Sequence, residues 1–135
     1  MQVDTVPFIP FPVREGPLMS PSEQLEFVLP KLRRFARAAV GDRDMADACV
    51  EQGILRMLKN PNFRSSLDED GFQFMLYRLV EQAIEDRLGS GFERQAWRAL
   101  VLVHVEGFSL DEAARILNID RGQTAKLIAA GEERL

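Results

Sequence analysis

Apolar positions between residues 20 and 40 recur at helical spacing and predict a long amphipathic helix. The tetrapeptide S-P-S-E at 20–23 puts serine at the N-cap, proline at the first helical position and glutamate at the third, which is typical of a helix start. We expect this helix to run to about Val40, with a bend at Pro30 because proline removes a backbone donor. Its predicted core-facing positions are Leu29, Leu32, Phe35, Ala36 and Ala39.

Two further helices follow the first. Gly41 is placed to end the first helix in a left-handed conformation, and Asp42 or Asp44 is placed to cap the second. The second helix is predicted to stop at Asn60, because the next residue is a proline. The third is predicted over 71–88. Its buried side is expected to hold Phe72, Met75 or Leu76, Leu79, Val80 and Ala83, and its exposed side Glu81, Glu85 and Asp86.

The helical pattern is interrupted by Gly89-Ser90-Gly91, a short flexible linker that is either natural or an engineered join. After it, the spacing predicts a helix over 92–106, with Trp97 as a core anchor. His104 is interpreted as an exposed or hydrogen-bonded histidine rather than a site residue.

Two short helices then follow, in the pattern of a helix-turn-helix. Ser109 begins an S-x-x-E capping box with Glu112, and Asp120 caps the last helix. No stretch shows the alternation of a strand, so we predict an all-α fold of two three-helix units joined by a short Gly/Ser linker. The predicted division is an extended arm at 1–19, a helical domain at 20–88, the linker at 89–91 and a helix-turn-helix domain at 92–135.

Residues 1–19 are rich in proline and large apolar residues, including V-P-F-I-P-F-P. Proline fixes φ and removes donors, so we expect an extended arm rather than a helix or strand. Two interpretations stay open: the arm docks on its own domain, or it binds a partner.

Composition narrows the class of protein. With 46% hydrophobic residues among 135, the chain is able to form a packed core. No apolar run approaches the roughly 20 residues of a membrane span, and no secretory signal is visible, so we expect a cytoplasmic location. Cys49, the single cysteine, is predicted to be a buried apolar residue. One histidine and no Cys/His cluster predict neither a metal site nor any other cofactor.

The distribution of charge argues against strong binding to nucleic acid. Residues 92–135, which contain the helix-turn-helix, hold six basic and seven acidic residues. Affinity for DNA depends largely on neutralising phosphates with Lys and Arg, and a free-standing DNA-binding protein usually carries a basic face. We therefore expect weak or no DNA binding.

Two long stretches of the chain resemble a known family. L-P-K-L-R-R-F-A-R-A-A-V-G-D-R-D-M-A-D-A-C-V-E-Q-G-I-L-R-M-L, at 29–58, is similar to the N-terminal helical domain of extracytoplasmic-function sigma factors. A-L-V-L-V-H-V-E-G-F-S-L-D-E-A-A-R-I-L-N-I-D-R-G-Q-T-A-K-L-I, at 99–128, is similar to their C-terminal helix-turn-helix domain. The resemblance implies a sigma2-like unit followed by a sigma4-like unit.

The last helix departs from the sigma-factor pattern. Three positions that are arginine in such sigma factors are Leu127, Ala130 and Glu132 here. The spacing predicts a core-facing stripe of Thr124, Ile128, Gly131 and Leu135, with Leu127 on its flank. Leu127 is therefore expected either to face a partner, to be tolerated at the surface, or to contact the first unit.

A sigma-like sequence without these arginines resembles the sigma-like domain of PhyR-type general-stress response regulators. The stretches L-Y-R at 76–78 and L-I-A-A-G-E-E at 127–133 are also similar to that group. In that family a degenerate sigma-factor copy binds the anti-sigma factor NepR, which frees the true sigma factor. The resemblance implies a NepR-like partner, helical when bound, and no membrane. It also implies a receiver domain after the sigma-like part, so the chain is either shortened or a stand-alone mimic. The residues expected to contact the partner are Asp47, Glu51, Gln52, Leu55, Tyr77, Arg121, Gln123, Thr124, Leu127 and Ala130.

Three alternatives follow from the same residues. No nucleophile triad, phosphate-binding loop or carboxylate–histidine motif is present, so we predict that the chain is not an enzyme. A divergent sigma factor would bind core RNA polymerase and read a promoter through Arg121, Gln123 and Lys126. A third possibility is a homo-oligomer formed through the arm or through the mimic surface.

Overall fold

A computed structural model describes residues 20–59, 69–89 and 91–134, and this part of the chain is helical and contains no strand, as predicted. The elements are α1 (Pro21–Val40), α2 (Arg43–Leu58), α3 (Glu69–Leu88), α4 (Phe92–Leu100), the π-helix η2 (Val101–Val105), α5 (Leu110–Leu117) and α6 (Arg121–Glu133). The expectations for the arm, for the residues after Asn60 and for Leu135 lie outside the described residues.

The ends of α1 form as the sequence predicts. The Ser20 hydroxyl accepts from the Glu23 backbone N–H, and the Glu23 carboxylate accepts from the Ser20 N–H, which completes a capping box. Gly41 ends the helix with φ of 88°, a left-handed conformation that glycine adopts without steric cost. Asp42, rather than Asp44, caps α2. The proline at position 30 lies within α1, which continues through it.

The helix-turn-helix is fixed by a second capping box. The Ser109 hydroxyl accepts from the Glu112 N–H, and the Glu112 side chain accepts from the Ser109 N–H. Asn118 ends α5 with φ of 61°, and the Asp120 carboxylate then accepts from the first turn of α6. These local interactions set the turn that places α6 across α4.

One local feature was not predicted. The helix that begins at Phe92 changes to π-helical geometry at Val101, where the Glu106 N–H donates to the Val101 carbonyl over 3.0 Å. A π-helical turn contains one more residue than an α-helical turn, so the side chains that follow it are rotated around the helix. Glu106, the residue that ends this segment, therefore points to a different neighbour than a regular helix would give it.

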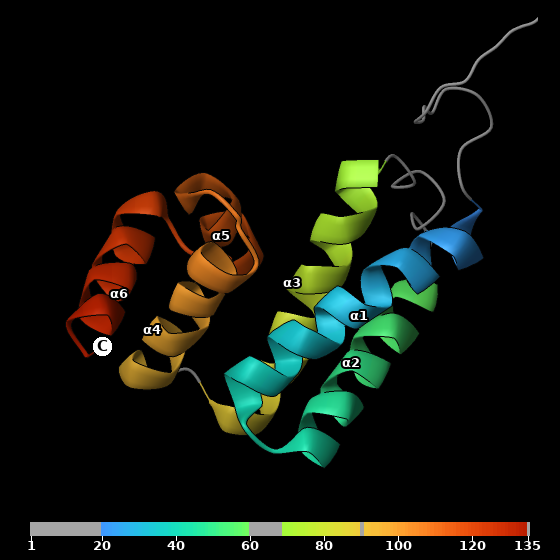
Figure 1. The fold of residues 1–135 in the computed structure, drawn as a ribbon, viewed down its shortest axis with the longest axis horizontal. Helices are drawn as coiled ribbons and strands as arrows, with labels where there is room; N and C mark the ends of the chain where they lie inside the picture. Colours follow the sequence, from blue (N-terminus) through green and yellow to red (C-terminus); the bar gives the residue numbers. More distant parts are fainter. Residues whose placement is uncertain (1–19, 60–68, 90, 135) are drawn as a thin grey trace, which may run out of the picture.

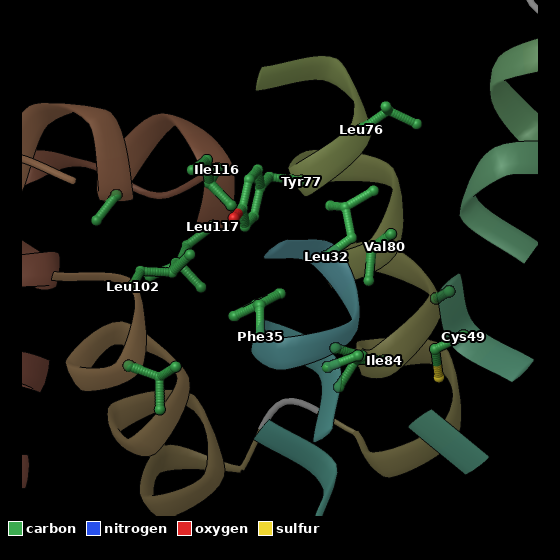
Figure 2. Close-up of a cluster of buried hydrophobic side chains, with 14 of the residues drawn as sticks. Leu32, Phe35, Cys49, Leu76, Tyr77, Val80, Ile84, Leu102, Ile116 and Leu117 are labelled. Carbon is green, nitrogen blue, oxygen red and sulfur yellow. The ribbon is translucent and has the colours of Figure 1, made fainter. Parts of the chain in front are cut away.

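Most of the predicted core positions are confirmed. Figure 2 shows side chains of α1 and α3 packing against Cys49 of α2 on one side and against Leu102 of η2 and two side chains of α5 on the other. Gly53 allows α2 and α3 to approach closely, since a Cβ there would lie 2.7 Å from a methyl group of Val80. Of the predicted core residues, Leu32, Phe35, Ala36, Cys49, Phe72, Leu76, Val80, Ala83, Thr124, Ile128 and Gly131 are buried, whereas Leu29, Ala39 and Leu79 are partly buried.

Helices α1–α3, here called the N-terminal half, lie beside α4–α6 with η2, here called the C-terminal half (Figure 1). The contacts between them, called the joint, run from α3 to α5 and from α1 to η2 and α4, and side chains of α3 also bond to Arg98 of α4 and to Glu106. A single cluster of buried apolar side chains includes residues of both halves. The exact domain division stays a prediction. None of the described helices is long and apolar enough to span a bilayer.

Candidate functional site

Four of the predicted partner-binding residues lie on α2. Glu51 and Leu55 are exposed, whereas Asp47 and Gln52 are half-buried. Asp47 is already engaged, because Arg37 of α1 donates to its carboxylate from Nη2 over 3.1 Å. We call this group the α2 patch. It offers an exposed leucine between acidic and amide side chains.

Three more predicted residues reach the surface of α6. Arg121 and Gln123 are exposed, and Ala130 is half-buried. The Arg121 guanidinium lies 3.2 Å from the carboxylate of Asp111 in α5, so its charge is partly neutralised within the chain. We call these three residues the α6 patch. Near the end of the helix, Glu132 lies 2.9 Å from the ring of His104, which is exposed as expected.

The two patches do not come together. Figure 1 shows α6 at one end of the molecule and α2 in the opposite half, with α3 and α4 between them. A partner that contacts both patches therefore has to extend across the joint.

The prediction that Leu127 faces outward is wrong, and Thr124 is likewise inaccessible to a partner. Both side chains are fully buried. Helix α6 packs on α4 along a stripe that is wide enough to include Leu127 as well as Thr124 and Ile128. The Thr124 hydroxyl donates to the Asp120 carbonyl over 2.8 Å, which satisfies it inside the core. Of the three former arginine positions, one has thus become a core residue.

Tyr77 is also buried, contrary to its predicted role at the surface. Its ring packs edge-on against Phe108 at 4.9 Å between centroids, and also against Phe35 at 5.6 Å. Its hydroxyl donates to the Glu106 carboxylate over 2.6 Å. Burial, together with this hydrogen bond to a carboxylate, raises the pKa of the Tyr77 hydroxyl. Tyr77 is therefore a component of the joint.

Glu106 connects the C-terminal half to two helices of the N-terminal half. Its side chain is 1% exposed and accepts from Nε and Nη2 of Arg34 in α1, each over 2.9 Å, as well as from Tyr77 in α3. Paired donation to two carboxylate oxygens is a strong and directional arrangement. The pairing also raises the pKa of Arg34.

A second carboxylate at the joint corrects another prediction. Glu81 was expected on the exposed side of α3, yet it is buried against Arg98 of α4, whose Nε lies 2.9 Å from each carboxylate oxygen. Burial raises the pKa of Glu81 to about 7, while Arg98 opposes the shift. Nη1 and Nη2 of Arg98 are buried and have no hydrogen-bond partner among the described residues.

Trp97 does not anchor the core as predicted. It is 44% exposed, and its indole N–H donates to the Ala38 carbonyl at the end of α1 over 2.6 Å. The large ring therefore covers the edge of the joint, because its one donor finds an acceptor in the other half.

A cleft of about 450 Å³ lies between α3 and α5, and no motif in the sequence predicts it. Arg115 stacks over the ring of Phe74 within it, with 4.5 Å between guanidinium carbon and ring centroid. Its lining is mixed: the apolar members are Phe74, Met75, Leu79, Ile116 and Leu117, the basic ones Arg78 and Arg115, and the acidic ones Glu81 and Glu85. The cleft lies on the joint, so a partner that spans both halves has it within reach.

Comparison with known families identifies the class. The sigma2 domain of PhyR matches residues 25–81, and the sigma-like domain of the response regulator PhyR matches residues 92–133. These helices, in this order, define a sigma-factor-like protein. More particularly, the chain belongs to the PhyR type of sigma-like domain.

Solved structures agree with this assignment. The response regulator PhyR from Brucella abortus is 29% identical with a TM-score of 0.66, and the alignment covers 85% of this chain and 44% of that one. PhyR from Bartonella quintana in complex with the anti-sigma factor NepR is 26% identical with a TM-score of 0.67, over 84% of this chain and 48% of that one. The chain thus spans less than half the length of these relatives. No curated protein matches it.

Proposed function

We propose that this chain is a sigma-factor mimic that binds an anti-sigma polypeptide of the NepR class and so releases the true sigma factor in a stress response. It acts by binding rather than by catalysis, and it works in the cytoplasm, where RNA polymerase and its sigma factors act. A PhyR protein similar to this chain has been crystallised with NepR, which supports the choice of partner.

The observation that carries the proposal is the surface of α6. In a sigma factor this helix would present arginines to DNA, whereas here Leu127 is buried, Ala130 is half-buried and Glu132 is acidic. Arg121, one of the cations that remain, is paired with Asp111. Protein–DNA affinity depends on free cations at phosphates, so this surface is better suited to a polypeptide than to a promoter.

The separation of the two patches supports a particular kind of partner. A folded globular partner would contact one end of the molecule, whereas a polypeptide that orders on binding can extend over a large surface. The α3–α5 cleft lies between the patches and gives such a segment apolar contacts at the middle of its path. We infer that the anti-sigma segment crosses the joint and is helical where it contacts each half.

The test is a pair of titrations at the same physiological salt concentration. The full chain is titrated by calorimetry with a NepR-class anti-sigma protein, and separately with core RNA polymerase in the presence of promoter DNA. We expect tight binding to the first and none to the second. Binding to polymerase with promoter-dependent initiation would instead identify a divergent sigma factor.

Variants of exposed residues test whether both patches take part. Leu55→Asp on the α2 patch and Gln123→Glu on the α6 patch should each weaken anti-sigma binding by about tenfold or more, since each places a charge within an interface. Glu26→Gln changes an exposed residue of α1 outside both patches and serves as the control. Equal affinities for all of these proteins would contradict the proposed surface.

A further inference from the structure

The covalent connection between the two halves does little to fix their relative placement. Helix α3 ends at Leu88 and α4 begins at Phe92. Gly89 has φ of 82°, and a Cβ added there or at Gly91 would meet no atom within 4 Å. The connection is thus short and rich in glycine, with open space around these two positions. Non-covalent contacts must therefore determine how the halves sit against each other.

Among those contacts, Glu106 is unusual in the number of elements it holds. It follows the π-helix of the C-terminal half, and it binds α1 through Arg34 and α3 through Tyr77. The two residues before it, His104 and Val105, are exposed, whereas its own side chain is 1% exposed. The rotation introduced by the π-helical turn directs this one carboxylate into the joint.

The joined arrangement also carries a cost. The Arg98 side chain is fully buried, and two of its nitrogen groups have no hydrogen-bond partner among the described residues. Buried donors without acceptors are unfavourable, more so when they belong to a charged group. An arrangement in which α3 and α4 separate would let water reach these groups. The favourable contacts of Glu106 and the unfavourable burial of Arg98 thus act in opposite directions across one interface.

We propose that Glu106 is a clasp that holds the two halves in the joined arrangement, and that its release allows them to separate while each half keeps its helices. The unpaired nitrogens of Arg98 offset part of the stabilisation that Glu106 and the shared apolar cluster give to the joined arrangement, so weakening the contacts of Glu106 raises the population of separated molecules. The clasp controls access to the surface around the α3–α5 cleft, because Glu81 is both a wall of that cleft and the partner of Arg98.

The test measures the distance between the two halves by double electron–electron resonance, in the full chain without any partner. Spin labels are attached to Asp44→Cys in α2 and Glu133→Cys in α6, two exposed positions, in a Cys49→Ala background. Tyr77→Phe keeps the ring and removes the hydroxyl, and Arg34→Gln removes the ion pair. Combining these two substitutions should raise the ratio of separated to joined molecules by about a hundredfold or more, since each removes at least one hydrogen bond to a charged group and each such bond is worth about tenfold.

Arg37→Gln is the matched control. It changes the same residue type on the same helix, but its partner Asp47 belongs to the N-terminal half. The proposal predicts an unchanged distance distribution for this variant and undiminished helical circular dichroism for all of them. It is overturned if the double variant keeps the original distribution, if Arg37→Gln alters it equally, or if separation occurs only with loss of helix. Glu106→Gln is a further check; should it fail to fold, the double variant still decides.

Because no partner is present in this measurement, its outcome is independent of whether the chain binds an anti-sigma factor. A failed titration with a NepR-class protein would leave the distance result intact. An unchanged distance would likewise leave the titration result intact.

Discussion

The two sides of α3 are held to their neighbours by different interactions. Toward α1 and α2 the helix presents Leu76, Val80 and Ile84, which pack without polar partners (Figure 2). Toward the C-terminal half it presents the Tyr77 hydroxyl and the Glu81 carboxylate, each bound to one specific group. The first side gains free energy from buried area, which many side chains share. The second also buries apolar groups, among them the rings of Tyr77 and Phe108, but it adds these directional contacts, which the three apolar side chains of the first side lack.

The largest effect is expected on the apolar side. Phe35→Ala should lower the free energy of unfolding by about 3–5 kcal/mol, because a fully buried ring leaves a cavity that the surrounding helices only partly fill. Urea unfolding followed by circular dichroism measures the change. Phe27→Ala, on the same helix but half exposed, is the control and should cost below about 1 kcal/mol. Similar losses for the two variants would contradict this description of the core.

On the polar side, a single change should be costly and a paired change should not. Arg98→Met leaves Glu81 buried without its cation and should lower the free energy of unfolding by about 3 kcal/mol. Adding Glu81→Leu removes the unpaired carboxylate and should restore most of the lost free energy of unfolding. Thermal and urea unfolding of both variants provide the measurement. A double variant as unstable as Arg98→Met would mean that the ion pair contributes net stability to the joint. The loss in Arg98→Met would then not come from an unpaired buried carboxylate.

The raised pKa of Glu81 gives the polar side a pH dependence that the apolar side lacks. Its pKa rises from 4.5 to about 7 on folding because burial disfavours the charged form. The folded state therefore binds the proton more tightly, so this group's contribution is complete below pH 4.5 and is lost as the pH rises through about 7. The difference in unfolding free energy between the native chain and Glu81→Gln, measured from pH 4 to 8, should decline by at most about 3 kcal/mol. A difference that grows with pH would contradict a raised pKa for Glu81 in the folded state.

The smallest effect is expected where the two halves are built alike. Both contain an S-x-x-E capping box, at Ser20 and at Ser109. Ser109→Ala and Ser20→Ala should each cost about 1 kcal/mol, since each leaves a backbone donor without its acceptor. Equal losses in thermal unfolding would show that local helix starts contribute equally in both halves. A much larger loss at Ser109 would indicate that the turn also supports the joint.

The sequence predicts helix starts and ends well because their signals are local. Ser20, Asp42, Ser109 and Asp120 cap helices as predicted, since a capping side chain bonds to backbone only two or three residues away. The apolar positions that periodicity predicts for the cores of α1 and α3 are also buried or partly buried, although α3 buries Tyr77 and Glu81 as well. The π-helical turn at Val101 was not foreseen, because no residue type in that run distinguishes it from an ordinary helix.

Residues at the joint were predicted poorly because their surroundings come from distant parts of the chain. Glu81 is charged, so its own helix predicts an exposed position for it. Its burial is tolerated because Arg98, from another helix, pairs with it. Leu127 was assigned by analogy with arginine in sigma factors, although its apolar chain fits the widened stripe of α6. Trp97 is predicted to be a core anchor of the second unit, but its indole N–H donates to a carbonyl of α1, which the local sequence does not reveal. The predicted roles of the α2 and α6 patches remain predictions.

The hydrogen bond from Trp97 to Ala38 has a practical consequence. This is the chain's single tryptophan, so its fluorescence comes from one place, the outer edge of the contact between α4 and α1. Emission from an indole depends on the polarity and hydrogen bonding of its surroundings. The native protein therefore carries an optical probe of its own joint, readable in milliseconds after mixing and without any label.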